Sequence, residues 1–267
     1  MKLPKFLRCP KTANKLRFSD TDSVVYVENS DIIYPVINGI IDFCPKVRGV
    51  VSASYDAFAS RYDEYITSSS VLMKLFQLFV WGSGDDGDLT TNTILSYLPS
   101  QFEGVLLDVP VGTGVFTDSL YARSPNATII AIDYSMGMLQ KAKERFERQG
   151  INNVCLIRAD VTNLPLTNSA VDIVLSMNGL HVFKDKQRAT AEMRRVLNKN
   201  GSLVASSYVK GGRKRWDWFV KYYGVRKGFF FPPFFTKDNI NTQLEGFEIR
   251  RQENGESFVS LEAVKVV

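Results

Sequence analysis

The most informative segment of the chain reads Leu107-Asp108-Val109-Pro110-Val111-Gly112-Thr113-Gly114. A short apolar run ends in an acid, and the chain then turns on two glycines before a helical pattern begins near Val115. Glycine has no Cβ and tolerates positive φ, so such a turn lets the backbone approach a ligand closely. We therefore expect a ligand site at this turn, between a strand and a helix.

Segments with strand and helix patterns alternate from residue 104 onward. We expect strands at 105–108, 127–133, 154–159, 171–176, 202–208, 247–251 and 258–266, and helices at 115–122, 136–149 and 184–197. Alternation of this kind predicts a parallel sheet with helices on both faces. Only the short turn Glu253-Asn254-Gly255 separates the last two strands, so they should form an antiparallel hairpin.

Two further acids follow the next two expected strands. Asp133 ends the second strand, and Asp160 comes directly after the third. One such acid alone is more often a helix cap or a solvated loop residue. Three acids at successive strand ends, counting Asp108, instead favour a bound cofactor, because an acid at such a position can hold ribose hydroxyls.

Together these motifs resemble the class I S-adenosylmethionine-dependent methyltransferases over about residues 104–267. In that family the turn reads acid-x-Gly-x-Gly-x-Gly, and Pro110 replaces the first glycine here. The segment Asp133-Tyr134-Ser135-Met136-Gly137-Met138-Leu139 is similar to the family's Asp-x-Ser-x-x-Met-Leu. A dehydrogenase is the competing interpretation, but its G-x-G-x-x-G spacing does not follow Gly112.

The resemblance implies an α/β, Rossmann-like, mostly parallel sheet of seven strands with a terminal antiparallel hairpin, and S-adenosylmethionine as the cofactor. Asp133 would then contact the ribose, Tyr134 would lie beside the adenine, and Asp160 with Val161 would also contact the adenine. The cofactor-binding residues so implied are Tyr55, Tyr62, Asp108, Pro110, Gly112, Gly114, Asp133, Tyr134, Met138, Asp160, Val161 and Asn178.

Residues 54–63 are similar to the segment in front of the core of ubiquinone-biosynthesis-type methyltransferases. There the segment packs over the cofactor, which makes Tyr55 and Tyr62 candidate lid contacts. The equal alternative is that both tyrosines bury one aromatic face of an amphipathic helix.

The fourth expected strand ends in Ser176-Met177-Asn178-Gly179-Leu180-His181, which in the family lies next to the transferred methyl group. His181 is the only histidine, and an imidazole with an ordinary pKa near 6.5 suits a general base at neutral pH. The alternative is a structural imidazole or a cofactor contact. Methyl transfer often needs no base, because positioning can supply most of the rate.

Residues 209–235 are dense in aromatic side chains and cations. Between residues 210 and 227 there are seven Lys and Arg side chains and one acid, Asp217. The segment could stack RNA bases, lie on a membrane surface, or cap a small substrate. We favour the cap, because aromatic side chains outnumber cations, and expect His181, Trp216, Tyr222, Phe231 and Phe234 to contact the substrate.

Residues 1–47 are short, β-prone and similar to a zinc-ribbon-like module that precedes some methyltransferases, including RNA-modifying ones. Cys9 and Cys44 are its only cysteines, and Thr12 stands where a second cysteine of the first pair is usual. A structural zinc site needs four ligands, so we expect no metal. The domain division is then a module at 1–47, a helical lid or linker at 48–100, and a cofactor-binding domain at 101–267 with an insertion at 209–235.

Composition supports an ordinary globular chain. Of 267 residues, 45% are apolar and 23% charged, with a formal net charge of +5, and three cysteines do not make a disulfide scaffold. Neither a transmembrane run nor an apolar signal-peptide core is visible, so we expect a soluble cytoplasmic protein.

The resulting hypothesis is a methyltransferase for a small-molecule acceptor. The alternatives are an RNA methyltransferase and a catalytically silent S-adenosylmethionine-binding protein.

Overall fold

The computed structural model describes residues 4–19, 21–45 and 85–266, and for residues 85–90 the backbone only. Most of the expected lid, with Tyr55 and Tyr62, lies outside these residues. The part of that segment that is described includes the helix α3, Asp85–Ser96.

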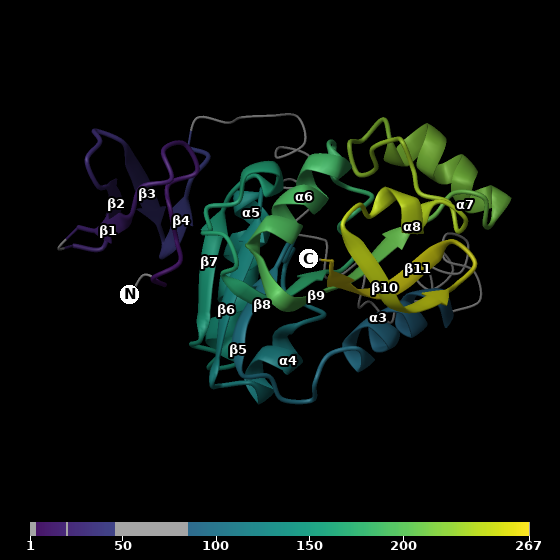
Figure 1. Cartoon of the computed structure of the whole chain (residues 1–267), viewed down its shortest axis with the longest axis horizontal. Coiled ribbons are helices and arrows are strands. Elements are labelled where there is room, and N and C mark those ends of the chain that lie inside the picture. Colours follow the sequence, from purple (N-terminus) through teal and green to yellow (C-terminus); the bar gives the residue numbers. More distant parts are fainter. Residues whose placement is uncertain (1–3, 20, 46–84, 267) are drawn as a thin grey trace.

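The strands form one mixed sheet (Figure 1). In space their order is β1-β2-β3-β4-β7-β6-β5-β8-β9-β11-β10, and the strands from β4 to β9 in that series run parallel. Their bounds are β1 Leu16–Phe18, β2 Val24–Val27, β3 Ile33–Ile37, β4 Ile40–Asp42, β5 Gly104–Asp108, β6 Ala127–Asp133, β7 Val154–Arg158, β8 Val171–Ser176, β9 Leu197–Tyr208, β10 Phe247–Asn254 and β11 Phe258–Lys265. The seven strands expected from the sequence are β5 to β11, and β10 and β11 pair antiparallel as expected.

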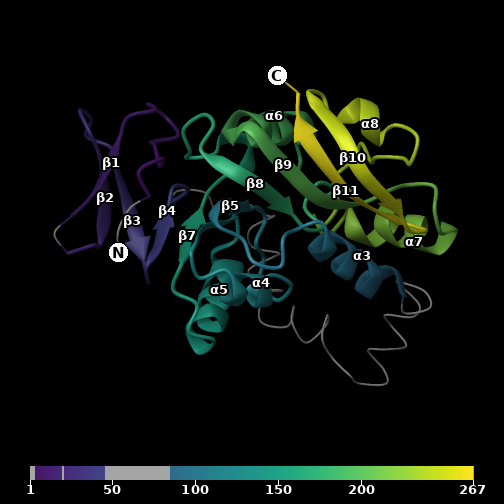
Figure 2. The same ribbon diagram turned by 60° about the horizontal axis from the view of Figure 1, so that its bottom comes forward.

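Helices cover both faces of this sheet (Figure 2). α3, α4 and α5 lie on one face, and α6 and α8 lie on the other. The remaining bounds are α4 Asp118–Arg123, α5 Met136–Arg148, α6 Lys186–Val196, α7 Lys214–Phe219, α8 Ile240–Gln243, a 3-10 turn η1 at Val161–Asn163 and a π-helical turn η2 at Val220–Gly224.

Two hydrophobic cores follow from the alternation of side chains along each strand. Leu106 of β5 packs with α3, α4 and α5, whereas its neighbour Leu107 packs in the core that contains α6. In the same way Leu203 and Val204 of β9 enter opposite cores. Because parallel strands are buried on both faces, these segments read as continuous apolar runs.

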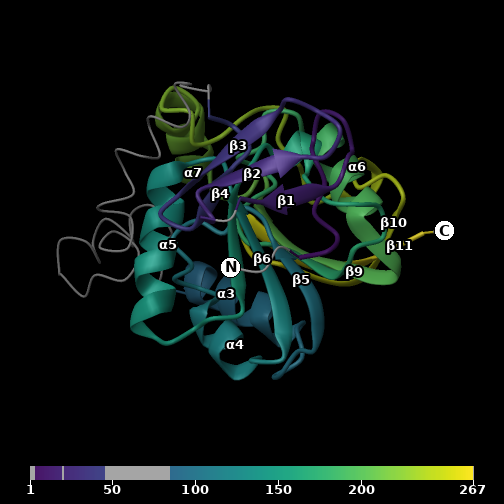
Figure 3. The same ribbon diagram turned by 90° about the vertical axis from the view of Figure 1, so that its left-hand side faces the viewer.

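The N-terminal strands extend the central sheet. β4 pairs parallel with β7 through Ile41 and Ile157, and Phe43 N–H donates to the Arg158 carbonyl at 2.9 Å. Leu7, Tyr34 and Phe43 belong to the same buried cluster as the central strands. Residues 4–19 and 21–45 therefore share a core with the central strands, and Figure 3 shows β1 to β4 lying across the β7 end of the sheet.

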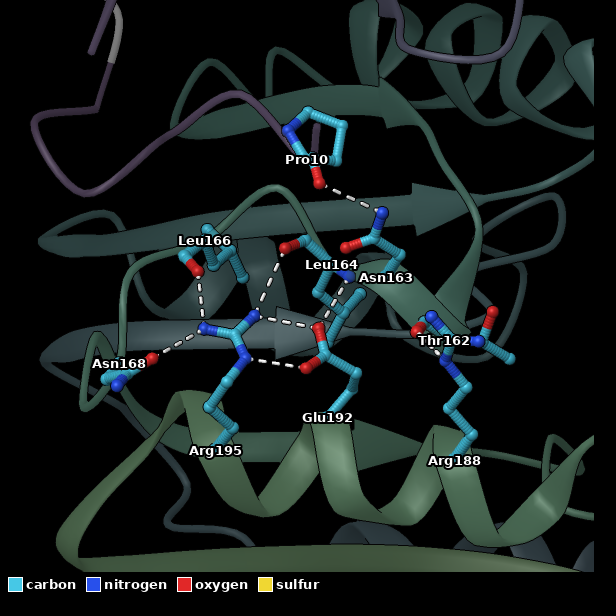
Figure 4. A network of polar contacts seen from close by, with 9 residues as sticks. All are labelled: Pro10, Thr162, Asn163, Leu164, Leu166, Asn168, Arg188, Glu192 and Arg195. Carbon is cyan, nitrogen blue, oxygen red and sulfur yellow. Dashed lines mark hydrogen bonds and ion pairs between the residues drawn. The ribbon is translucent and has the colours of Figure 1, made fainter. Parts of the chain in front are cut away.

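The loop after β7 is fastened to both the N-terminal segment and α6 (Figure 4). Asn163 donates to the Pro10 carbonyl at 3.0 Å. On the other side, Arg195 of α6 donates to the Leu164 and Leu166 carbonyls at 3.1 and 2.7 Å and pairs with Glu192. Glu192 in turn accepts from Leu164 N–H at 2.8 Å, so the loop that begins at Asp160 is held at both ends.

Two local expectations differ from the structure. α4 begins at Asp118, because residues 115–117 form turns between the glycine turn and the helix. β9 begins at Leu197, five residues before the strand expected at 202–208, and so includes Lys199-Asn200-Gly201. These residues lie at the register shift opposite Val171 and Ile173, where the longer strand accommodates extra residues against β8.

Candidate functional site

The strand order reverses between β5 and β8. The chain runs from β5 outward through β6 to β7, then crosses to β8 on the other side of β5 and continues outward to β9. In open parallel sheets, ligands bind outside the carboxyl ends of the strands at such a reversal. The glycine turn lies here and is anchored on both sides. Val109 N–H donates to the Leu175 carbonyl, and Val111 N–H donates to the Ile132 carbonyl, each at 2.9 Å.

The two glycines of the turn have different roles. Both have positive φ, +57° at Gly112 and +71° at Gly114. A Cβ on Gly114 would lie 2.5 Å from the Phe146 ring, so packing against α5 requires glycine there. A Cβ on Gly112 would meet no atom within 4 Å, which leaves an open face beside the backbone. Gly114 is thus needed by the fold, and Gly112 exposes backbone to a ligand.

Asp133 holds the turn from the neighbouring strand. Its two carboxylate oxygens accept from Gly112 N–H at 2.9 Å and from Ser135 N–H at 2.8 Å. Ser135 caps α5 by accepting from Met138 N–H at 3.1 Å, and Met138 itself is buried. The structure therefore brings Asp133, Gly112 and the start of α5 together. Met138 lies in the first turn of α5 with its side chain buried.

Asp108 is buried at the end of β5. One carboxylate oxygen, Oδ2, accepts from the Tyr121 hydroxyl, whereas Oδ1 is buried with no hydrogen-bond partner in the described part of the chain. Burial raises the pKa of Asp108 to about 7, and the nearby charge of Asp133 acts in the same direction. Ser176 Oγ at the end of β8 is a second buried oxygen without a partner among the described residues.

Pro110 occupies the position of the family's first glycine and packs against β8. The Val109–Pro110 peptide bond is cis. A Cβ on Gly179 would lie 2.5 Å from Pro110 Cδ and 2.3 Å from Ser176 Oγ, so the chain after β8 approaches the turn as closely as glycine permits. Gly179 is a site residue that the sequence reasoning did not single out, although it lies inside the quoted motif.

Tyr134 lies at the far side of the turn, beside Arg158. Arg158 Nε donates to the Tyr134 carbonyl at 3.0 Å, and its guanidinium lies 5.9 Å from the Tyr134 ring centroid. The same guanidinium pairs with Asp42 at 3.2 Å and donates to the Cys44 carbonyl at 3.3 Å. Arg158 and Asp42 are both buried. The N-terminal strands thus reach the candidate cofactor site, which was not expected.

Asp160 and Val161 follow β7 next to this pair. Asp160 is exposed and caps η1, because its Oδ1 accepts from the N–H and the hydroxyl of Thr162, each at 2.8 Å. Asp108, Asp133 and Asp160 therefore stand at the carboxyl ends of three adjacent parallel strands, as the sequence predicted.

Asn178 is held in a left-handed conformation, with φ +51°. Its N–H donates to Ser206 Oγ at 2.9 Å, and its side-chain oxygen accepts from the same hydroxyl at 3.2 Å. β9 thereby fixes the segment that leads from β8 to His181.

His181 has a protonation state that the general-base prediction did not anticipate. Its Nδ1 accepts from Tyr208 N–H at 3.0 Å, so the proton of the neutral ring lies on Nε2. Burial lowers the pKa of His181 to about 3, and the nearby Lys186 charge acts in the same direction. In this arrangement the imidazole is a hydrogen-bond donor and a poor proton acceptor.

The candidate substrate residues do not form one group. Trp216 is buried in an aromatic cluster with Tyr208, Phe230 and Phe258, whereas Tyr222 is half exposed on the surface. Phe231 N–H donates to the His181 carbonyl at 3.0 Å, which brings the insertion to the site. Phe230, which the sequence reasoning did not select, stacks on the His181 ring with centroids 4.7 Å apart.

Lys186 is a second residue that the sequence analysis missed. It is buried, and its ammonium donates to the Phe183 and Phe231 carbonyls and lies 5.9 Å from the Phe234 ring centroid. Burial lowers the pKa of Lys186 to about 8. Its position in the first turn of α6 gave no sequence signal, because lysine is common on helix surfaces.

Neither a metal site nor a membrane span is evident in the ranges that the structure describes. Within residues 4–19, 21–45 and 85–266, no group of three or more His, Cys, Asp or Glu side chains is arranged to hold a metal ion. Over the same ranges, helices that combine the length and apolar character needed to cross a bilayer are absent.

Comparison with known proteins agrees with this geometry. Residues 106–201 match a family described as "Methyltransferase domain". An uncharacterized chloroplastic methyltransferase of Arabidopsis thaliana is 30% identical over 51% of this chain and 39% of its own length. A demethylmenaquinone methyltransferase of Clavibacter sepedonicus is 30% identical over 61% of this chain and 60% of its own length. The chain thus spans less than two thirds of either relative.

Solved structures show the same fold at lower identity. A methyltransferase of Thermotoga maritima has a TM-score of 0.58 at 21% identity, covering 80% of this chain and 99% of its own. The cyclase SpnF has a TM-score of 0.63 at 17% identity, covering 81% and 95%. Since a cyclase shares the architecture, the fold alone does not name a reaction. Residues 106–201 therefore match a methyltransferase domain, and the strand order and the acids around the glycine turn agree with that match.

Proposed function

We propose that this protein transfers a methyl group from S-adenosylmethionine to a small-molecule acceptor. The observation that carries the proposal is the open glycine turn with three carboxylates around it. Asp108, Asp133 and Asp160 stand at the ends of adjacent strands, and the backbone at Gly112 faces open space.

The residues present suit this cofactor. Asp108 Oδ1 is buried without a partner in the described ranges, and it would accept from the cofactor's amino group. An unpaired buried acceptor costs about 1–3 kcal/mol, so a ligand that supplies a donor here is favoured. Asp133 would hold the ribose while it keeps the turn in place, and Tyr134 with Asp160 and Val161 would border the adenine. When bound, the cofactor supplies a methyl group already activated by its sulfonium.

The protein's own groups then position the acceptor. Asn178 and His181 lie on the β8 side of the turn, and the insertion closes over His181 through Phe230 and Phe231. His181 would donate through Nε2 to an acceptor atom and would not remove its proton. Lys186, held by two carbonyls, keeps the insertion against α6. We assign no general base.

The aromatic wall supports a small acceptor. Small-molecule sites are lined mainly by apolar and aromatic side chains with few polar groups, as around His181. Relatives named for small substrates, such as demethylmenaquinone, are consistent with this class.

Binding of S-adenosylhomocysteine, measured by calorimetry, tests the cofactor assignment. Asp133→Ala removes the acceptor for two turn N–H groups, and we expect affinity to fall at least tenfold. Asp238→Ala removes an exposed aspartate outside the site and is the matched control. Unchanged affinity in Asp133→Ala would refute the assignment.

Turnover is tested separately, with methyl-labelled S-adenosylmethionine and two extracts, one of metabolites and one of RNA. Label in small molecules supports the proposal, and label in RNA alone contradicts the acceptor class. Cofactor binding without transfer to either extract would instead identify a silent binding protein.

A further inference from the structure

The helical part of the insertion presents an unusual surface. α7 and η2 form one continuous helical segment whose inner face is buried through Trp216, Val220 and Gly224. Its outer face carries Trp218 and Tyr222, with side chains 61% and 50% exposed, and Tyr223 beside them is 47% exposed. The buried inner face is enough to pack this helix against the rest of the protein. The exposed aromatic rings on its outer face therefore need another explanation.

Exposed positive charge surrounds these rings. The exposed cations of the segment are Lys214, Arg215, Lys221, Arg226 and Lys227. None of them has a carboxylate partner within ion-pair distance in the described ranges, where the ion pairs of this segment involve Arg213 only. The only acid, Asp217, accepts from the Tyr208 hydroxyl and from Gly211 N–H, so it is turned toward the protein. The outer face is therefore aromatic and cationic without compensating acids.

Both tyrosine rings already have an aromatic partner and a cation beside them. Tyr222 packs against Trp218 with centroids 5.5 Å apart, and the Lys221 ammonium lies 5.1 Å from its centroid. Tyr223 stacks on Phe219 at 5.1 Å, with Lys227 at 6.0 Å. Stacking of RNA bases needs free ring faces along a groove, whereas tyrosine and tryptophan at a bilayer surface act as amphipathic rings at headgroup level. Arrangement and charge together match an anionic lipid surface.

We infer that this face, defined as Trp218, Tyr222, Tyr223 and the five exposed cations around them, docks the protein onto an anionic lipid bilayer. The cations attract the headgroups, and the aromatic rings enter the interface. The same insertion reaches His181 through Phe230 and Phe231, so docking would place the candidate acceptor site close to the lipid. The inference rests on the surface itself and does not depend on methyl transfer.

Vesicle sedimentation of the full chain tests this docking. We expect binding to vesicles of phosphatidylcholine with one quarter phosphatidylserine, and little binding to pure phosphatidylcholine. Each cation near such a surface contributes about fivefold to binding. The pair Lys221→Gln and Lys227→Gln should therefore weaken binding about 25-fold, whereas Lys11→Gln with Lys199→Gln, which changes two exposed lysines elsewhere, should bind like the unmodified chain.

Tryptophan fluorescence reports insertion independently. Trp218 is exposed, so its emission should shift to the blue when anionic vesicles are added, and Trp218→Phe should abolish that shift. Equal binding to both kinds of vesicle, or unchanged binding of the Lys221 and Lys227 pair, would overturn the inference. So would binding of single-stranded RNA in place of vesicles at the same salt concentration.

Discussion

Asp108 should make the free energy of unfolding depend on pH in an unusual direction. Most carboxylates in folded proteins are stabilised in their charged form, but burial raises the pKa of this one to about 7, against an ordinary value of 3.8. Between these two values the folded state binds more protons than the unfolded state. Stability therefore falls as pH rises through this range, and is independent of Asp108 ionisation below about 3.8 and above about 7.

The magnitude follows from the separation of the two pKa values. Each unit corresponds to about 1.4 kcal/mol, so between pH 5 and pH 8 the Asp108 contribution should fall by about 2–3 kcal/mol. His181 opposes this. Its folded pKa of about 3 lies below the ordinary 6.5, so protonation of the unfolded state destabilises the fold as pH falls below 6.5. The unmodified chain alone will therefore show a flattened profile.

The informative quantity is the difference between the unmodified chain and Asp108→Asn, because His181 cancels in it. Asparagine still accepts from Tyr121 but carries no charge. Urea unfolding at pH 5, 6, 7 and 8 should show the unmodified chain losing about 2–3 kcal/mol relative to the variant across the series. Asp31→Asn, which removes an exposed carboxylate, is the matched control. A difference that stays constant within about 0.5 kcal/mol would show that Asp108 is not held in its protonated form.

Three further predictions concern other parts of the site. Gly112→Ala should cost about 1 kcal/mol of stability because of its positive φ, and it should weaken S-adenosylhomocysteine binding. Gly114→Ala should cost about 1–3 kcal/mol more, because its methyl group would overpack against Phe146. Equal unfolding free energies in the two variants would contradict this division of roles. Asp42→Ala leaves the Arg158 guanidinium buried without its carboxylate, so it should lower the free energy of unfolding in urea by roughly 3–5 kcal/mol. A loss below about 1 kcal/mol would mean that the pair is solvated. Nuclear magnetic resonance of the single histidine should show a neutral ring with its proton on Nε2 down to pH 5; titration near pH 6.5 would disprove the buried geometry.

Much of the central domain was predictable because its signals are local. Leu106 and Leu107 sit in an apolar run that ends in Asp108, and such runs followed by an acid or glycine mark parallel strands and their carboxyl ends. The positions of Asp133 and Asp160 followed from the same pattern, since parallel strands end at one edge of a sheet. Their contacts with bound cofactor stay predictions.

The contacts that escaped prediction join distant parts of the chain. Asp42 and Arg158 meet only because β4 pairs with β7, and no periodicity in either strand records its partner. Lys186 occupies a position that a helical pattern assigns to solvent, and the insertion buries it by folding back through Phe231. The tautomer of His181 depends on Tyr208 N–H in another strand. Local patterns carry no information on such pairings.

The parallel pairing of β4 with β7 also bears on self-association. A sheet whose last strand is uncovered presents a row of unpaired N–H and C=O groups, to which a strand from another molecule can add. Here β4 pairs with β7, and β3, β2 and β1 follow it outward as antiparallel strands. The edge on this side of the sheet is therefore β1, a strand of three residues, and very short edge strands add poorly to strands of other molecules. A version of the protein trimmed to residues 101–267 would instead end at β7, a strand of five residues, and should associate through it more readily.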